Sequence, residues 1–294
     1  MPAAARRHPG TGNFPTTLPQ EGLTSLRRRL DAEMVRRGLA PTRHRARHDI
    51  EAGRVRVGGV PADKPARMVA PDDRLELAVP ARRFVGRGGD KLDGALDRFD
   101  VVVEGRRALD AGSSTGGFTD CLLQRGAASV VAVDVGYGQL DLRLRQDPRV
   151  VVFERTNVRD LTPDLLGVEP VPLIVADLSF ISLRTVAPAL LGLAAPGADL
   201  VVLVKPQFEA GRVEASRNRG VIRDPEVWAR VLHEVVDAFD GAGAGLRGLM
   251  SSPLVGAEGN VEFLAHLGPG RPASIDVTAA VTDAVAEAVG PDAG

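Results

Sequence analysis

A glycine-rich stretch, Asp110-Ala-Gly-Ser-Ser-Thr-Gly-Gly-Phe118, has the residue types of a site that binds a nucleotide-like ligand. It follows Arg107-Ala-Leu109, where we predict a strand, and it leads into Thr115–Arg125, where we predict a helix. At such a junction, small residues let a ligand approach the backbone, and the first N–H groups of the helix are free to donate hydrogen bonds. Taken alone, the stretch fits an ordinary glycine turn equally well.

The spacing of these glycines favours one class of ligand. A dinucleotide-binding turn needs a middle glycine, but the three positions are occupied by Gly112, Ser114 and Gly117. No Gly-Lys-Ser/Thr motif follows, which argues against hydrolysis of nucleoside triphosphates. Asp134, at the end of the next predicted strand, is placed to bind ribose hydroxyls, and Asp110 could face a cationic amino-acid group. Two carboxylates around a glycine turn suit S-adenosylmethionine, whose sulfonium and ammonium groups are positive.

The residues after the fourth predicted strand bear on the methyl acceptor. This segment is Asp177-Leu-Ser-Phe180, and it lacks the Asp/Asn-Pro-Pro-aromatic element of methyltransferases that modify amino groups of DNA. The single cysteine, Cys121, lies inside a predicted helix beside Leu122 and Leu123, so we interpret it as a buried structural thiol rather than a nucleophile. A hydroxyl group or another simple acceptor remains.

Strands and helices are predicted to alternate from Arg107 onward. Apolar strands that alternate with helices indicate an α/β fold with a parallel sheet covered on both faces. Near the C-terminus, Leu246–Met250 and Val261–His266 predict an added antiparallel pair, which is typical of Rossmann-like methyltransferase sheets, and Asp276–Val289 predicts a terminal helix. The other strands are expected at Arg107–Asp110, Ser129–Asp134, Val150–Phe153, Leu173–Ala176 and Leu200–Val204, and the helices at Thr115–Arg125, Leu183–Leu193 and Pro225–Phe239.

The length and composition are those of a globular protein with room for two domains. The chain has 294 residues, a formal net charge of −1 and 44% hydrophobic residues. We expect a disordered tail at 1–24, a small α+β domain at 25–81, a flexible basic linker at 82–89, the methyltransferase-type domain at 90–270, and a C-terminal helix and tail at 271–294. The most apolar segment, Val186–Val204, contains prolines, glycines and Asp199, so it predicts a helix, a turn and a strand rather than a membrane span.

The near-neutral net charge hides a strongly basic segment, Leu26–Val60. It contains ten arginines and four acidic residues, an excess of six positive charges. A helix that ends at Gly38, a second that ends near Gly53, and a hairpin at Val55–Val60 would place the arginines where they can follow phosphates. The segment resembles the S4 RNA-binding domain through Leu39-Ala-Pro-Thr-Arg43, Ile50-Glu-Ala-Gly-Arg-Val55, Gly59-Val60 and Lys64-Pro65.

The larger part of the chain resembles the TlyA family, haemolysin-like ribosomal RNA ribose methyltransferases that are related to the FtsJ-like enzymes. The resemblance extends from residue 25 to about 267. It rests on Asp110–Phe118, Val131-Ala-Val-Asp-Val-Gly-Tyr-Gly138, Glu154-Arg-Thr-Asn157, Ala176-Asp-Leu-Ser-Phe-Ile-Ser182, Val204-Lys-Pro-Gln-Phe208 and Gly259-Asn-Val-Glu262.

The resemblance implies a catalytic set of Lys91, Asp177, Lys205 and Glu262. A ribose 2′-hydroxyl must lose a proton as it attacks a methyl group, and a lysine serves as the base only where burial and a neighbouring cation favour its neutral form. We expect Lys205 to be the base and Lys91 to stabilise the developing oxyanion. Asp177 would orient the lysines, and Glu262 would brace Lys91 or the ribose. Asp90, next to Lys91 in sequence, could pair with it and weaken its effect.

The resemblance also implies ligands and partners. The cofactor would be S-adenosylmethionine, and the partner would be ribosomal RNA or ribosomal subunits, with cytidines of 16S or 23S RNA as targets. The cofactor would be bound by Asp110, Gly112, Ser113, Ser114, Thr115, Gly116, Gly117, Phe118, Asp134, Val135, Asn157 and Asp177. The RNA would be bound by Arg27, Arg36, Arg37, Arg43, Arg47, Arg54 and Arg87. We further hypothesise that a loop with Arg212, Arg217 and Arg219 orders on RNA binding.

Other functions compete with this interpretation. A non-catalytic RNA-binding or ribosome assembly factor could retain such a fold, although the complete set of four site residues favours an enzyme. A membrane-acting protein is suggested only by the family's haemolysin label, and the sequence lacks a membrane span. We therefore expect a cytoplasmic, monomeric enzyme without a metal ion, and the single cysteine fits a reducing compartment.

Overall fold

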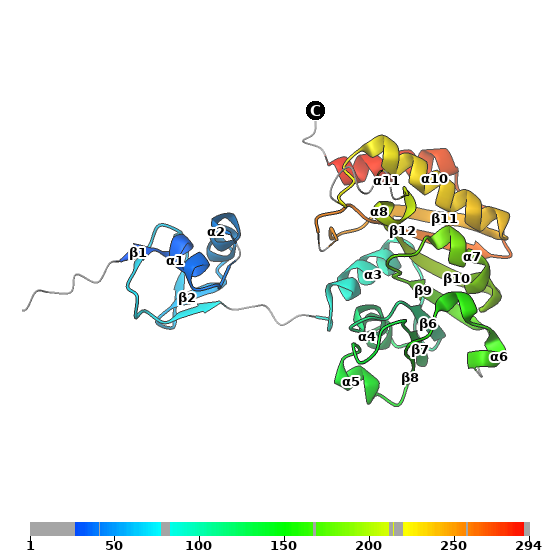
Figure 1. Ribbon diagram of the computed structural model, residues 1–294, viewed down its shortest axis with the longest axis horizontal. Helices are drawn as coiled ribbons and strands as arrows, with labels where there is room; N and C mark the ends of the chain where they lie inside the picture. The colour runs from blue at the N-terminus through cyan, green and yellow to red at the C-terminus, as the bar shows by residue number, and fades with distance from the viewer. Residues whose placement is uncertain are drawn as a thin grey trace, which may run out of the picture. The chain divides into compact units, whose positions relative to one another are not determined.

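The chain divides into two compact units, Met1–Ala81 and Arg82–Gly294 (Figure 1). The computed structural model describes residues 27–40, 42–77, 83–166, 169–211, 214, 220–256 and 258–290. The predicted disordered tail at 1–24 lies outside these residues.

The smaller unit packs two helices against short strands. Its helices are α1 (Leu30–Arg36) and α2 (Arg43–Glu51), and the side chain of Thr42 caps α2 by accepting a hydrogen bond from the Arg45 N–H. The strands β3 (Val60–Ala62), β2 (Val55–Val57) and β5 (Leu75–Leu77) form an antiparallel sheet in that order. A separate pair joins β1 (Arg28–Arg29) to β4 (Met68–Val69). The predicted helix pair and hairpin are therefore confirmed.

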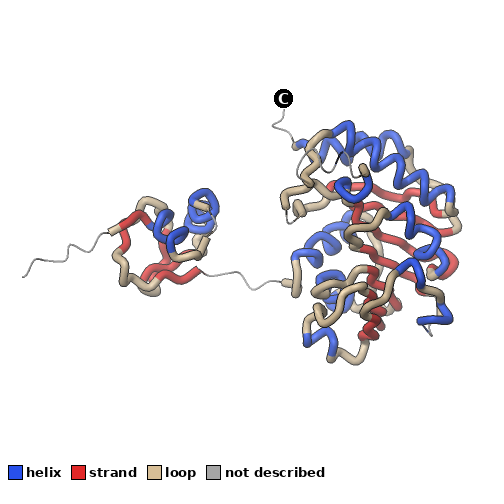
Figure 2. The backbone as a smooth tube through the Cα atoms, viewed as in Figure 1, coloured by secondary structure: helices blue, strands red, loops and turns tan. Residues whose placement is uncertain are grey.

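The larger unit is built on one seven-stranded sheet, whose strands are red in Figure 2. The strand order is β11-β12-β10-β9-β6-β7-β8. Neighbouring strands from β10 to β8 pair in parallel, whereas β12 runs antiparallel to both β10 and β11. The predicted Rossmann-like sheet with an antiparallel late strand is confirmed. The strands are β6 (Arg107–Ala111), β7 (Ser129–Val133), β8 (Val150–Phe153), β9 (Val171–Ala176), β10 (Ala194–Val204), β11 (Ala244–Ser251) and β12 (Phe263–Pro269).

Helices cover both faces of this sheet, because successive residues of each strand point to opposite sides. Leu173 and Val175 of β9 pack in one apolar cluster with residues of α3 and α4, whereas Ile174 packs in the other with residues of α7, α10 and α11. Figure 1 shows α10 and α11 side by side on their face. The helices are α3 (Arg87–Arg98), α4 (Gly117–Gln124), α5 (Leu142–Arg145), α6 (Pro163–Leu166), α7 (Leu183–Gly192), α8 (Pro206–Glu209), α10 (Pro225–Gly241) and α11 (Val277–Val289), with a 3-10 turn at Val158–Asp160.

The predicted flexible linker at 82–89 is wrong for residues 83–89. Phe84 is buried in the same apolar cluster as Leu92, and the Val85 N–H donates a hydrogen bond to the Asp120 carboxylate (2.8 Å). The helix α3 already begins at Arg87. The basic, glycine-rich composition of this segment suggested a flexible linker, but burial of the single aromatic residue, Phe84, is enough to hold it against the larger unit. The larger unit therefore starts before residue 90.

Candidate active site

The glycine turn between β6 and α4 can be built only with glycine at two positions. Gly112 has φ +89°, and a Cβ atom there would lie 2.5 Å from the carbonyl oxygen of Asp177. Gly116, the residue before α4, has φ +100°, and its Cβ would lie 2.3 Å from a side-chain carbon of Leu144. Both the left-handed backbone and the missing side chain are needed. The turn therefore lies directly against the loop that follows β9.

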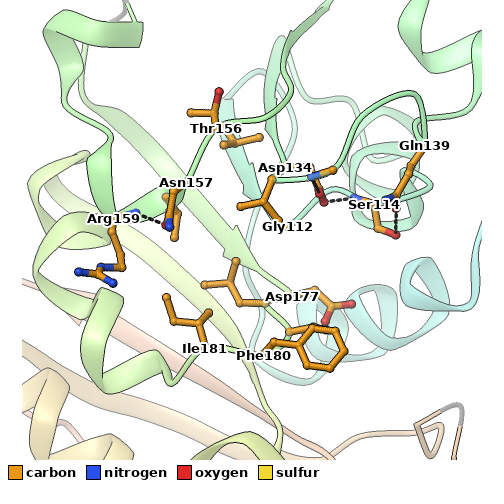
Figure 3. Close-up of a pocket in the computed structure, with 16 residues that line it drawn as sticks. Gly112, Ser114, Asp134, Gln139, Thr156, Asn157, Arg159, Asp177, Phe180 and Ile181 are labelled. Atoms are coloured by element: carbon orange, nitrogen blue, oxygen red, sulfur yellow. Dashed lines mark hydrogen bonds between the residues drawn. The ribbon is translucent and has the colours of Figure 1, made fainter.

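A cavity of about 640 Å³ opens beside this turn, at the carboxyl ends of β6, β7 and β9 (Figure 3). The Asp134 carboxylate connects two segments that line this cavity, one with Ser114 and one with Gly136. One carboxylate oxygen accepts a hydrogen bond from the Ser114 N–H (2.7 Å), and the other accepts one from the Gly136 N–H (2.6 Å). The carboxyl edge of a parallel sheet is where ligands bind in open α/β folds.

The predicted cofactor-binding residues divide into two sets. Those that line the cavity are Gly112, Ser114, Asp134, Val135, Asn157 and Asp177. Those that do not line it are Asp110, Ser113, Thr115, Gly116, Gly117 and Phe118. The side chains of consecutive residues in a tight turn point in different directions, so only some residues of the continuous motif Asp110–Phe118 line the cavity.

Asp110 differs most from its predicted role. It has no exposed surface, and its Oδ2 atom accepts a hydrogen bond from the Thr119 hydroxyl (2.6 Å). Burial, which outweighs that hydrogen bond, raises the pKa of Asp110 to about 7, and the nearby Asp177 adds to the rise. Phe118 is also buried, in the apolar cluster beneath the turn. The prediction that Asp110 faces a ligand's cationic group is wrong for this structure, since the carboxyl group does not reach the cavity.

Several lining residues were not predicted from sequence. They are Val133, Gly136, Gln139, Thr156, Val158, Arg159, Leu178, Ser179, Phe180 and Ile181. Most of them directly follow the ends of β7, β8 and β9, as the predicted Asp134, Asn157 and Asp177 do. The rule that ligands bind beyond the carboxyl ends of parallel strands could have found these segments, although not the individual side chains.

A second cavity, of about 470 Å³, shares Ser179 and Phe180 with the first. It is lined by three of the four predicted catalytic residues: Lys91, Lys205 and Glu262. The fourth, Asp177, lines the first cavity. The four residues come from α3, from the ends of β9 and β10, and from the residue before β12. The structure thus brings them to two adjoining cavities.

These four residues form two ion pairs. The Lys205 ammonium lies 2.6 Å from the Asp177 carboxylate and donates a hydrogen bond to the Ser179 hydroxyl (2.9 Å). The Lys91 ammonium pairs with the Glu262 carboxylate. Lys91 is 7% exposed and Lys205 is 9% exposed, so each buried charge has a partner of opposite sign.

The suspected pairing of Asp90 with Lys91 is not found. Asp90 is exposed, whereas Lys91 is buried and turned toward Glu262. Adjacent residues of an α-helix such as α3 do not face each other, so closeness in sequence does not bring their side chains together.

Lysine is rare in this chain, and that is a sequence signal for the site. The protein contains 37 lysines and arginines together, of which only Lys64, Lys91 and Lys205 are lysines. Two of these three line the same cavity. A guanidinium remains charged at any pH a protein meets, whereas an amine can take up and release a proton. The two lysines of this cavity are therefore side chains that could exchange a proton, which the arginines that dominate the chain could not do.

Neither a cysteine nucleophile nor a metal centre is found at the site. Cys121 is fully buried, and burial raises the pKa of its thiol to about 12, which agrees with the predicted structural role. Within the described ranges, no cluster of histidine, cysteine and acidic side chains could hold a metal ion. In the same part of the chain, no helix is both long and apolar enough to cross a membrane.

Five of the six predicted RNA-binding arginines of the smaller unit pair with buried carboxylates, and Arg29, which was not predicted, joins them. Asp31 accepts hydrogen bonds from Arg29, Arg43 and Arg47, whose side chains are about half exposed. Burial acts to raise the pKa of Asp31, but these guanidinium groups hold it well below its usual range. Three arginines around one carboxylate leave two positive charges in excess, together with N–H donors that have no partner among the described residues.

The other predicted arginines are used differently. Arg37 pairs with Glu33 and donates hydrogen bonds to three backbone carbonyl groups, so its donors are engaged within the unit. Arg36 also pairs with Glu33, Arg54 pairs with Asp49, and Arg27 is exposed. Arg87, in the larger unit, donates to the Val255 carbonyl. The loop arginines Arg212, Arg217 and Arg219 lie outside the described residues.

Comparison with known proteins agrees with this architecture. The FtsJ-like methyltransferase family matches residues 84–269, and the S4 domain matches residues 28–75. The chain is 54% identical over 242 residues to the "16S/23S rRNA (cytidine-2′-O)-methyltransferase TlyA" of Mycobacterium tuberculosis, which covers 82% of this chain and 90% of the relative. It is 39% identical over 238 residues to "Hemolysin A" of Brachyspira hyodysenteriae, covering 81% and 98%.

A solved structure, named "Putative hemolysin from Streptococcus thermophilus", aligns with 39% identity and a TM-score of 0.70, covering 89% of this chain and 95% of the other. The sheet order, the glycine turn and the cavity at the carboxyl edge define a Rossmann-like methyltransferase joined to an S4 domain. Within that class, the chain belongs to the TlyA family of FtsJ-like methyltransferases.

We predict that Gly112→Ala weakens binding of S-adenosylmethionine by at least about tenfold, because the new methyl group would collide with the Asp177 backbone and reshape the cavity wall. Isothermal titration calorimetry measures the loss. Gly138→Ala is the matched control, since Gly138 also has a positive φ (+70°) but no atom lies within 4 Å of its Cβ position. An equal loss in both variants would contradict the role of the close contact.

We also predict that Asp110→Asn removes the contribution of this carboxyl group to the pH dependence of the free energy of unfolding. The pKa of Asp110 is raised from 3.8 to about 7, so the folded protein keeps a proton that the unfolded chain loses in this range. The free energy of unfolding should therefore fall as pH rises from about 4 to about 7, by up to about 4 kcal/mol for this group.

Urea unfolding at pH 5 and pH 8, followed by the fluorescence of the single tryptophan, Trp228, measures this difference. Asp164→Asn, at an exposed position of α6, should keep the pH dependence of the unaltered protein. An unchanged pH dependence in Asp110→Asn would contradict the assignment.

Proposed function

We propose that this protein transfers a methyl group from S-adenosylmethionine to the 2′-hydroxyl of cytidines in ribosomal RNA. The observation that carries the proposal is the pair of adjoining cavities, with the Lys205–Asp177 ion pair at their junction. One cavity suits a nucleoside-like methyl donor, and the other presents two lysines to an acceptor. The name of the relative from Mycobacterium tuberculosis supports the substrate class.

The residues of the first cavity fit S-adenosylmethionine. Its lining contains two carboxylates, Asp134 and Asp177, against one guanidinium, Arg159, which suits a positively charged ligand with ribose hydroxyl groups. The absent side chain of Gly112 leaves the turn in contact with the Asp177 backbone, so a ligand can lie flat against both. Asp134 and Asn157 would hold the nucleoside end, and Gly112 and Asp177 the end that carries the methyl group. When bound, S-adenosylmethionine supplies a methyl group attached to a positively charged sulfur.

The side chains of the second cavity would activate the acceptor. Lys205 would act in its neutral form: once its ammonium has released a proton to solvent, the amine would take the proton of the 2′-hydroxyl. Asp177 and Ser179 would hold the lysine in place through the contacts at 2.6 and 2.9 Å. Lys91 would stabilise the negative charge that develops on the 2′-oxygen, and Glu262 would hold Lys91 in position. Correct alignment of the acceptor with the donor would contribute much of the remaining acceleration.

The smaller unit would supply affinity for RNA. The cluster formed by Arg29, Arg43 and Arg47 around Asp31 combines excess positive charge with unengaged donors, which is what binding to phosphate groups requires. We propose Arg43 and Arg47 as phosphate contacts, whereas the engaged donors of Arg37 favour a structural role. A ribosomal substrate would place the enzyme in the cytoplasm.

A second function is suggested by the haemolysin names of relatives. The site argues for the enzyme instead, because a lytic role gives no reason for the buried Lys91, Lys205 and Glu262 and the half-buried Asp177 to form ion pairs beside a nucleotide-type cavity. A non-catalytic RNA-binding factor would likewise have no need for these buried charges, which cost free energy to desolvate.

We predict that Lys205→Ala lowers methyl transfer by about 10²–10⁴-fold, the usual contribution of a positioned base, while affinity for S-adenosylmethionine changes little. Lys205→Arg should fail equally, because a guanidinium cannot act as a base. Incorporation of labelled methyl groups into unmethylated ribosomal subunits measures the rate. Lys64→Ala, which alters the lysine outside the site, should keep the unaltered rate at saturating RNA. Label incorporation that is independent of Lys205 would refute the mechanism.

We predict that the double substitution Arg43→Gln and Arg47→Gln reduces the dependence of RNA binding on salt. Each lost phosphate contact lowers the slope of log K against log salt concentration by about 0.7–0.9, so the slope should fall by about 1.5. Arg37→Gln should lower the stability of the smaller unit and leave the slope unchanged. Filter-binding titrations with ribosomal RNA measure the slopes, and the opposite ranking of the variants would contradict the assignment.

A further inference from the structure

Glu209, the last residue of α8, is a buried carboxylate beside the candidate active site that takes no part in the two ion pairs of that site. It is 3% exposed. Its Oε1 atom accepts a hydrogen bond from the Leu183 N–H (2.6 Å), and its Oε2 atom accepts one from the Ser182 hydroxyl (2.5 Å). The Arg184 guanidinium lies 3.4 Å from Oε2. Three consecutive residues at the start of α7 thus compensate one buried charge.

Glu209 joins the two segments that carry the charged residues of the site. After β9, the chain passes through Asp177 and Ser179 and enters α7 at Leu183. After β10, it passes through Lys205 and ends α8 at Glu209. The carboxylate therefore connects the far ends of both segments, while the Lys205–Asp177 pair connects their near ends.

The segment after β9 depends on such external contacts. Phe180 has φ +64°, a left-handed conformation that a bulky residue keeps only where the surroundings hold it. Its side chain is 91% exposed, and its ring lies 5.1 Å from the ring of Phe208 in α8. This exposed contact contributes little burial, so the buried hydrogen bonds of Glu209 are the stronger connection between the segments.

We propose that Glu209 is a positioning residue that holds the loop of Asp177 and Ser179 in register with Lys205. This inference rests on the proposed methyl transfer. Without the carboxylate, the start of α7 loses the acceptor of its Leu183 N–H, and the loop that leads into it can shift relative to Lys205. A displacement of about 1 Å in a catalytic group can cost about 10²-fold in rate.

The test compares Glu209→Ala with Glu209→Gln in the full-length protein. Glu209→Ala should lower kcat for methylation of ribosomal subunits by about 10²-fold and change both KM values by less than about threefold, because the lost contact aligns groups and does not bind ligands. Glu209→Gln should recover most of kcat, since its amide oxygen can accept from the Leu183 N–H and its amide nitrogen can donate to Ser182.

The matched control is Glu234→Ala. Glu234 is a second carboxylate bound to Arg184, through a hydrogen bond of 2.7 Å, but it lies on α10, and the hydrogen bonds from Ser182 and Leu183 go to Glu209 instead. This variant should keep the kcat of the unaltered protein. Ser182→Ala removes one hydrogen bond to Glu209 and also the hydroxyl that caps α7 by accepting from the Arg184 N–H; it should lower kcat by roughly tenfold, and it replaces Glu209→Ala if that variant does not fold.

A second measurement separates failure of this inference from failure of the proposed function. Hydrogen–deuterium exchange of residues 177–183 should accelerate in Glu209→Ala and in Ser182→Ala, and not in Glu234→Ala, whether or not the chosen RNA is a substrate. Unchanged exchange, or faster exchange with an unchanged kcat, would overturn the positioning role. An unaltered protein that methylates no ribosomal RNA would instead refute the proposed function, and exchange would still decide the role of Glu209.

Discussion

The ion pair between Lys205 and Asp177 depends on the parallel pairing of β9 with β10. Val202 of β10 lies opposite Ala176 of β9, so Asp177 and Lys205 leave neighbouring strands at the same edge of the sheet. A buried ammonium requires a partner, and this register supplies one. The antiparallel strand β12 brings in the second pair, because Phe263 at its start lies opposite Val204 at the end of β10. Glu262 is thereby delivered to the edge where Lys205 emerges. The antiparallel strand β12, which is typical of methyltransferase sheets, thus places Glu262 where it pairs with Lys91.

The loop after β9 separates the two cavities and contributes to both. Asp177 lines the cavity of the glycine turn, whereas Ser179 and Phe180 line both cavities. The contact between Gly112 and the Asp177 backbone fixes one end of this loop, and Glu209 holds the other end at the start of α7. A change in either anchor would therefore alter both cavities together.

The smaller unit uses its many arginines for two purposes. Some arginines form ion pairs with buried carboxylates, which neutralise part of the positive charge, as Glu33 does with Arg36 and Arg37. Asp31 instead binds three half-exposed guanidinium groups, and most of their donors have no partner in the described part of the chain. A count of charges along the sequence cannot distinguish the two uses, because it gives neither the burial of the carboxylate nor the acceptors that each arginine finds.

The sequence by itself indicated the order of strands and helices and the glycine turn, because local hydrophobic periodicity and backbone requirements are sufficient for these. The four residues of the proposed chemistry came from the resemblance to a known family, and no local pattern would have selected them. Only the tertiary structure decided that Phe84 belongs to the core, that Asp110 lies behind the cavity, that Lys91 pairs with Glu262 rather than Asp90, and that Glu209 joins two segments. Each of these facts depends on a partner distant in sequence, such as the 171 positions between Lys91 and Glu262. Which partners meet is set by strand register and helix packing, which no local pattern specifies.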